Sequence, residues 1–311
     1  MPPKIRVLFE PKTEPHAPDL YDFDGVVEGI DGFGSVGREA LRQYHEDGFL
    51  LVRGAFSAVL VDAAKSCLLE LGTSDEPAIE GICFEGAIRD CLPDLNEKGD
   101  GRSKSGRTKD LMMGCPDDRL PDLDPQLRLK FVRKFMGFAG QNPPLGAVAK
   151  HPPLLQVVER FLDAPPKLHQ DMALVKPPGG REKPWHQDRA YFNVEAQAPV
   201  VGVWIALDEA TPQNGCMRLV PRGHKAGPHL HFWRRDWQIC DTDVPLKRVA
   251  APMAAGDCLL FDSLLPHGTP FNATAASRWA LQFHYAAAGA PSTSDEHRLA
   301  VFGAEGKNVS C

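Results

Sequence analysis

Several features that would place this chain in a simple class are missing from its 311 residues. It has no run of 18 apolar residues, so we expect no transmembrane helix and no membrane partner. The opening residues, MPPKIRVLFEPKTEP, lack the apolar stretch of a signal peptide, and we expect a cytoplasmic protein. The formal net charge of −6 argues against a nucleic-acid binder, which would normally be basic. The eight cysteines include no CxxC pair, and we expect mostly reduced thiols in the core.

The order of the expected elements divides the chain into helices followed by strands. Residues 1–34 are rich in Pro, Asp and Gly and are expected to form an extended arm. Residues 73–124 have no clear period, and 98–109 are expected to form a polar loop. From residue 168 onward, short apolar runs alternate with turn residues, which is typical of a β-barrel or sandwich. Helices are expected at 35–47, 57–72, 125–138 and 152–163, with a strand starting at Phe49.

Two of the expected strands have a polar or small face and an apolar face. In HQDMALVK, alternate residues from Gln170 to Lys176 share one side. In RWALQFHY, Arg278, Ala280 and Gln282 share a side, and the large apolar residues take the other. This pattern favours a barrel with a polar mouth. We expect His169 and His284 to pack on the far faces of their strands.

The stretch WHQDRAYF holds a histidine and an aspartate two residues apart. In a strand, His186 and Asp188 would point to the same side. His267 follows a later apolar strand and can complete a set of two imidazoles and one carboxylate. That facial triad leaves coordination positions open and suits non-haem Fe(II) oxygenases. Arg278, eleven residues after His267, can hold a distant carboxylate with its fork of donors.

These motifs resemble the phytanoyl-CoA dioxygenase family of Fe(II)/2-oxoglutarate oxygenases. The likeness covers roughly 40–285 and is carried by HQDRAYF, VWIALDEATPQNGCMRLVPRGHK and HGTPFNATAASRWAL. It implies a mainly β fold with flanking α-helices. That fold is a double-stranded β-helix, or jelly-roll (cupin-like) barrel, preceded by N-terminal helices. We expect an arm at 1–34, one domain at 35–290 with its core at about 168–287, and a tail at 291–311.

The resemblance also assigns roles to individual residues. His186, Asp188 and His267 match the iron ligands, and Arg278 matches the clamp for the far carboxylate of 2-oxoglutarate. A lysine upstream of the core often joins that contact, and we choose Lys134, with Lys130 as the alternative. Tyr191 and Phe192 lie where relatives shape the substrate cavity. The other residues implied in 2-oxoglutarate binding are Thr269, Trp204, Met172 and Gln170.

The resulting hypothesis is a hydroxylase that uses Fe(II), 2-oxoglutarate and O₂ on a small-molecule substrate and releases succinate and CO₂. Desaturation or ring closure at the same site remains open, but Asp188 argues against halogenation, because related halogenases lack the carboxylate. A zinc hydrolase and a catalytically silent barrel are alternatives from other classes. An anionic substrate is one candidate, held by basic loops that include Arg234 and Arg235. We expect a monomer or homodimer, and we give His229 and His231 no metal role.

Overall fold

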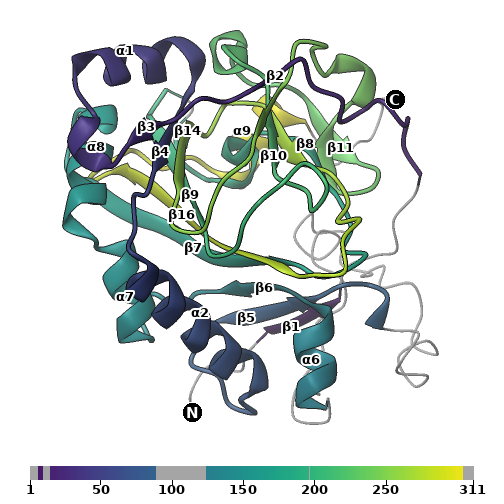
Figure 1. Ribbon diagram of the computed structural model, residues 1–311. Coiled ribbons are helices and arrows are strands. Elements are labelled where there is room, and N and C mark those ends of the chain that lie inside the picture. The colour runs from purple at the N-terminus through teal and green to yellow at the C-terminus, as the bar shows by residue number, and fades with distance from the viewer. Residues whose placement is uncertain (1–5, 10–14, 89–123, 196, 304–311) are drawn as a thin grey trace.

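Most strands of the protein lie in two sheets, and most helices pack on one side of the larger sheet (Figure 1). The computed structural model describes residues 6–9, 15–88, 124–195 and 197–303. The predicted polar loop at 98–109 lies outside these residues.

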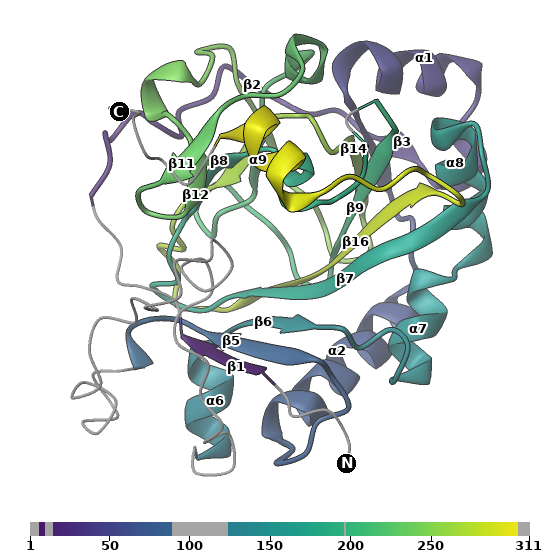
Figure 2. The same ribbon diagram turned by 180° about the vertical axis from the view of Figure 1, so that it is seen from behind.

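Within the described residues, the larger sheet has nine strands, and the long strands β7 and β16 cross the molecule next to each other (Figures 1 and 2). Most neighbours are antiparallel, but β1 pairs with β5, and β3 with β4, in parallel. In spatial order the strands are β1 (Arg6–Phe9), β5 (Gly81–Phe84), β6 (Val132–Met136), β7 (Pro166–Lys176), β16 (Arg278–Ala287), β9 (Val200–Ala206), β14 (Cys258–Asp262), β4 (Phe49–Arg53) and β3 (Ile30–Asp31).

A smaller sheet faces the larger one and carries the histidine strands. Apolar side chains from both sheets, such as Trp204, Leu219 and Phe261, form a shared core between them. This arrangement is the expected jelly roll, although the described sheets are mixed and do not close into a continuous barrel. A separate hairpin is formed by β11 (His231–Trp233) and β12 (Trp237–Ile239). The smaller sheet contains β2 (Gly25–Val26), β13 (Val249–Ala251), β10 (Met217–Leu219), β15 (His267–Thr269) and β8 (Lys183–His186).

The helices bury the outer face of the larger sheet. Tyr44 and Phe161 stack with ring centroids 3.8 Å apart in a cluster that also contains Trp279, Leu281 and Phe283. The predicted division of the last strand into two faces is therefore confirmed. Each fully buried large apolar side chain contributes roughly 1.5–3 kcal/mol. The α-helices of the described residues are α1 (Arg38–Asp47), α2 (Ala58–Thr73), α6 (Pro125–Phe131), α7 (Pro143–Ala149), α8 (Pro152–Leu162) and α9 (Asp295–Phe302).

The helix expected at 125–138 is wrong in its second half. Asp124 caps α6 by accepting bonds from the backbone of Gln126 and Leu127, but the helix ends at Phe131. The next five residues form β6, which pairs with both β5 and β7. Five residues are too few to tell the apolar period of a helix from that of a strand. Pairing with two neighbouring strands makes this stretch a strand.

Several other expected boundaries also differ. Residues 73–124 contain strand β5, and α7 was not expected. The first expected helix begins at Arg38, because residues 33–35 form a separate 3₁₀ turn. Ser57 caps α2 as predicted, and its hydroxyl oxygen accepts a bond from the backbone of Leu60.

The N-terminal arm is part of the sheets rather than a free extension. It supplies β1, β2 and β3. Trp185 donates from its indole nitrogen to Leu20 O (3.1 Å) and stacks on Tyr21, so the arm packs against the residue before His186. These contacts brace strand β8 from its outer side.

The C-terminal region from 291 contains helix α9. Phe302 is buried with Ala190 and Trp237, next to the 3₁₀ turn η3 (Asp188–Tyr191). Arg298 donates to Ala190 O at 2.7 Å. The helix therefore supports the turn that begins with Asp188.

Of the five cysteines among the described residues, four have free thiols, as expected for most of them. Cys67, Cys83, Cys216 and Cys258 are free, and Cys240 is disulfide-bonded.

Candidate active site

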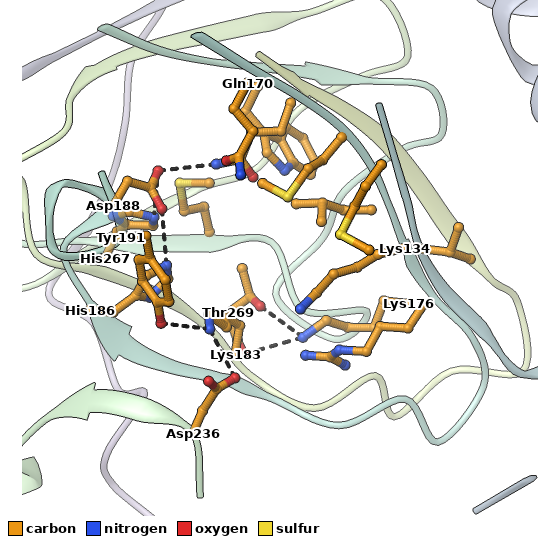
Figure 3. Close-up of a pocket in the computed structure, with 18 of the residues that line it drawn as sticks. Lys134, Gln170, Lys176, Lys183, His186, Asp188, Tyr191, Asp236, His267 and Thr269 are labelled. Atoms are coloured by element: carbon orange, nitrogen blue, oxygen red, sulfur yellow. Dashed lines mark hydrogen bonds and ion pairs between the residues drawn. The ribbon is translucent and has the colours of Figure 1, made fainter. Parts of the chain in front are cut away.

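His186, Asp188 and His267 come together between the two sheets. His186 ends β8 and His267 begins β15, and the two are register partners in adjacent strands. Asp188 is the first residue of η3 rather than a strand residue, but Gln187 between them keeps an extended backbone. The side chains of the pair therefore still point the same way. Their candidate ligand atoms all lie within 4.8 Å of one another (Figure 3).

Both histidines present the same nitrogen to the centre of this cluster. His186 Nδ1 lies 2.8 Å from Pro184 O, and His267 Nδ1 lies 2.9 Å from Leu265 O. A carbonyl only accepts hydrogen bonds, so each Nδ1 carries the proton and each Nε2 keeps a lone pair. Burial lowers the pKa of His267 to about 4, which favours the neutral imidazole that metals bind.

Asp188 is held by donors on strand β16. Its Oδ2 atom lies 2.8 Å from His284 Nε2 and accepts a bond from Gln282 Nε2 at 3.0 Å. Burial raises the pKa of Asp188, but His267 and His284 outweigh that effect and hold the pKa well below its ordinary value. The carboxylate is therefore ionised. Two neutral imidazole nitrogens and one carboxylate form a donor set that fits a divalent iron ion.

The prediction that His284 packs on the far face of its strand, away from the pocket, is wrong. His284 lies six residues after Arg278, so it shares the inward face of that residue and of Gln282. Counting residues along the strand could have placed it there. The β7–β16 register shifts directly after His284, so the alternation cannot simply be extended beyond it.

A buried histidine in the hairpin fixes the residue between the two ligands of the HxD pair. The backbone nitrogen of Gln187 donates to His231 Nε2 at 3.0 Å, and His231 Nδ1 bonds His229 O. Burial lowers the pKa of His231 to about 3. His231 is therefore a neutral acceptor, and its importance could not be inferred from a loop-like sequence.

Arg278 lies at the other end of the same pocket. Its guanidinium carbon is 5.0 Å from the centre of the Trp204 ring. Its Nε and Nη1 atoms are buried and have no hydrogen-bond partner in the part of the chain that the structure describes. Unpaired buried donors are costly, and a ligand carboxylate would satisfy them.

Lys176 contacts Thr269 at this end of the pocket, and the sequence had given it no role. Its Nζ atom donates to Thr269 Oγ1 at 2.9 Å. Burial, together with the nearby Arg278, lowers the pKa of Lys176 well below its ordinary value. Lys134 on β6 also lines the pocket, and both lysines point into the same region (Figure 3). Lys130 is exposed on α6 and does not line it.

The remaining wall of the pocket lies near the metal ligands. Tyr191 donates to Trp237 O at 2.8 Å and accepts a bond from Lys183 Nζ at 3.1 Å. Lys183 also pairs with Asp236 at 2.8 Å, and the sequence had singled out neither of these two residues. Gln170, Met172 and Phe192 line the same pocket.

The two arginines proposed as substrate contacts do not line this pocket. Arg235 is buried, bonds Glu182, and forms two bonds to the carboxylate of Asp241 at 2.6 and 2.8 Å. Arg234 is exposed, with its guanidinium 4.0 Å from the same carboxylate. Arg218 is also buried, and it donates to Tyr21 O and Cys216 O.

A jelly roll with a His-Asp-His cluster inside it is the arrangement that suits a non-haem iron protein. The comparisons identify the family. The family model described as Phytanoyl-CoA dioxygenase (PhyH) matches residues 44–280. The chain belongs to this family. Human peroxisomal phytanoyl-CoA dioxygenase is 30% identical over 193 residues, which cover 58% of this chain and 55% of the human protein. The chain thus spans about half the length of the curated relatives it matches.

Solved structures show the same fold at low sequence identity. EctD from S. alaskensis, crystallised with 2-oxoglutarate and 5-hydroxyectoine, has a TM-score of 0.57 and 19% identity over 96% of this chain and 89% of EctD. SnoK, an alpha-ketoglutarate-dependent carbocyclase, has a TM-score of 0.56 and 20% identity over 90% of this chain and 98% of SnoK. Among the residues that can be described, no helix is long and apolar enough to cross a membrane.

Proposed function

We propose that the chain is an Fe(II)- and 2-oxoglutarate-dependent dioxygenase that hydroxylates a small molecule and converts 2-oxoglutarate and O₂ to succinate and CO₂. The observation that carries the proposal is one pocket with a metal-ligand set at one end and unpaired buried arginine donors at the other. Family membership supports the same activity.

Each end of the pocket has a defined task in this proposal. His186, Asp188 and His267 would hold Fe(II), which supplies O₂ activation when bound. Arg278 and Thr269 would bind the far carboxylate of 2-oxoglutarate, with Trp204, Met172, Gln170 and Lys134 lining its site. A carboxylate held there directs the 2-oxo acid end of the molecule toward the metal ligands.

The wall near the metal is the proposed substrate side. Tyr191 and Phe192 line the pocket there, and the Phe192 ring lies 4.7 Å from that of His284. Apolar walls around the reacting centre exclude water and so protect the oxidant from side reactions. Arg234 and Arg235 are not included as substrate contacts, because neither lines the pocket. The cytoplasmic location and a monomeric or homodimeric state remain predictions from the sequence.

Oxygen uptake and succinate formation together test the proposal. The protein loaded with Fe(II) is expected to consume O₂ and convert 2-oxoglutarate to succinate, and the protein loaded with Zn(II) is not. Substrate consumption with Zn(II) and without O₂ would instead favour a zinc hydrolase. Metal binding without any turnover would favour a silent barrel. Product analysis distinguishes hydroxylation from desaturation or ring closure, the latter suggested by the carbocyclase SnoK.

A further inference from the structure

Lys176 is a buried lysine that lines the pocket beside Arg278. It is 3% exposed and ends strand β7. Within the described residues, its Nζ atom donates to three neutral oxygens, namely Thr269 O, Thr269 Oγ1 and Pro270 O. No acidic side chain of the described residues forms an ion pair with it. A buried cation without an anion is unfavourable unless a ligand supplies the missing charge.

The register of the sheet places a second buried cation beside Lys176. Lys176 and Arg278 are direct partners in the antiparallel pair of β7 and β16. Arg278 is 2% exposed and also lacks a carboxylate partner in the described part of the chain. Two neighbouring buried cations repel each other, so an anion bound between them gains from both.

Lys176 also determines what the Thr269 hydroxyl can do. When Lys176 is protonated, as a neighbouring carboxylate favours, its three N–H groups can only donate, so Thr269 Oγ1 accepts in their 2.9 Å bond. The hydroxyl proton of Thr269 is then free to donate to another acceptor. A carboxylate at Arg278 would provide that acceptor within the same pocket, which all three residues line.

The surrounding chain holds Lys176 in this position. Asn272 is buried and donates to Lys176 O at 3.0 Å. Gly215 adopts a φ of +83°, and a Cβ atom there would lie 2.5 Å from Pro270 O and 3.0 Å from Lys176 Cδ. The turn therefore needs glycine both for its backbone and for the lysine stem that passes it.

We propose that Lys176 is a positioning residue of the 2-oxo acid site. It directs the Thr269 hydroxyl proton toward the far carboxylate and adds a second positive charge beside Arg278. The site thereby selects 2-oxo dicarboxylic acids over 2-oxo monocarboxylic acids. This inference rests on the proposed 2-oxoglutarate-dependent function.

The test compares two ligands that differ only at the far end. Anaerobic calorimetry on the Fe(II)-loaded protein measures the affinities of 2-oxoglutarate and of 2-oxopentanoate, which has a methyl group in place of the far carboxylate. Lys176→Met is expected to weaken 2-oxoglutarate binding about tenfold or more and to leave 2-oxopentanoate binding within about twofold. Lys130→Met, which removes an exposed lysine outside the pocket, is the matched control and is expected to change neither affinity.

A second variant separates this role from a structural one. Thr269→Val removes the hydroxyl and keeps the backbone acceptors of Lys176. It is expected to weaken the binding of 2-oxoglutarate but not that of 2-oxopentanoate. The fold loss of 2-oxoglutarate affinity in the double variant is expected to be smaller than the product of the two single fold losses. Thr269→Val remains informative if Lys176→Met does not fold.

One outcome would overturn the inference, namely an unchanged ratio of the two affinities in Lys176→Met or Thr269→Val, whether both affinities stay the same or both fall by the same factor. If the wild-type protein binds 2-oxoglutarate and this ratio does not change in the variants, the role of Lys176 is refuted and the proposed function is not. If the wild-type protein binds no 2-oxo acid, the proposed function fails with it.

Discussion

His284 Nε2 lies 2.8 Å from Asp188 Oδ2, although the two residues are 96 positions apart in the chain. Gln282 Nε2 approaches the same oxygen at 3.0 Å. The other oxygen, Oδ1, faces His186 Nε2 at 3.3 Å. Strand β16 thus occupies Oδ2, which also lies 3.6 Å from His267 Nε2, and leaves Oδ1 without a partner on β16, which suits a carboxylate that binds metal through one atom.

Replacing His284 by Phe is expected to weaken Fe(II) binding by roughly 10–100-fold, the usual effect of losing a partner that orients a metal ligand. Anaerobic Fe(II) titration measures this effect. His169→Phe is the control, because His169 is an exposed histidine on the neighbouring strand. An iron affinity of His284→Phe equal to that of the wild type would show that β16 does not orient the carboxylate.

Replacing Arg278 by Ala removes a charge-assisted pair worth about 1.5–3 kcal/mol. We expect a roughly 10- to 150-fold loss of 2-oxoglutarate affinity. Iron affinity should change little, because Arg278 is at the opposite end of the pocket. Calorimetric titration with 2-oxoglutarate checks the prediction, and unchanged binding would mean that the far carboxylate is held elsewhere, for example by Lys134.

His231 should make the stability of the metal-free protein depend on pH. Its pKa falls from 6.5 to about 3 on folding, so between these values the unfolded chain takes up a proton that the folded protein does not. The free energy of unfolding therefore falls as the pH falls through this window, by at most roughly 1.4 kcal/mol per pH unit from this group. Denaturant titrations at several pH values measure the slope.

Two substitutions of His231 separate its charge from its hydrogen bond. His231→Gln keeps an acceptor for the Gln187 backbone and should flatten the pH dependence with a small cost at neutral pH. His231→Ala leaves that buried N–H unsatisfied and should cost about 1–3 kcal/mol at neutral pH. A pH slope in His231→Gln as steep as in the wild type would rule out His231 as its source.

The proposed metal ligands and Arg278 could be predicted from the sequence because each of the two pairs, His186 with Asp188 and His267 with Arg278, is close in the chain, and the family resemblance joins the two pairs. The strand assumed for the HxD pair ends before Asp188, which lies in a 3₁₀ turn. The two side chains still point the same way because the backbone of Gln187 is extended. The alternation of side chains along the strand predicts that Lys176 faces the same side as Gln170. A lysine before two prolines does not, however, indicate burial. Its importance depends on Thr269, which lies far from it in the chain.

Tertiary pairing explains most of the elements that the sequence did not predict. Strand β6 takes its form from β5 and β7, so no local pattern separates it from the preceding helix. The strands β2 and β3 of the arm have two residues each, which is too short for any period to be detected.

Replacing any of the three proposed iron ligands by Ala should abolish turnover and weaken iron binding while the fold remains intact. The reason is that a triad reduced to two donors also leaves a buried gap in the coordination sphere. Fe(II) titration and circular dichroism of His186→Ala, Asp188→Ala and His267→Ala check both parts. His229→Ala, a half-buried histidine outside the cluster, is the control, and near-normal activity in any of the three ligand variants would contradict the assignment.

The fate of labelled oxygen tests the central claim most directly. Oxidative decarboxylation of 2-oxoglutarate places one atom of O₂ in succinate, so the Fe(II)-loaded protein incubated with 2-oxoglutarate and ¹⁸O₂ should release succinate that carries one ¹⁸O atom. Asp188→Ala should release none above background. Succinate without the label, or no succinate from wild-type protein that has bound both Fe(II) and 2-oxoglutarate, would contradict the account.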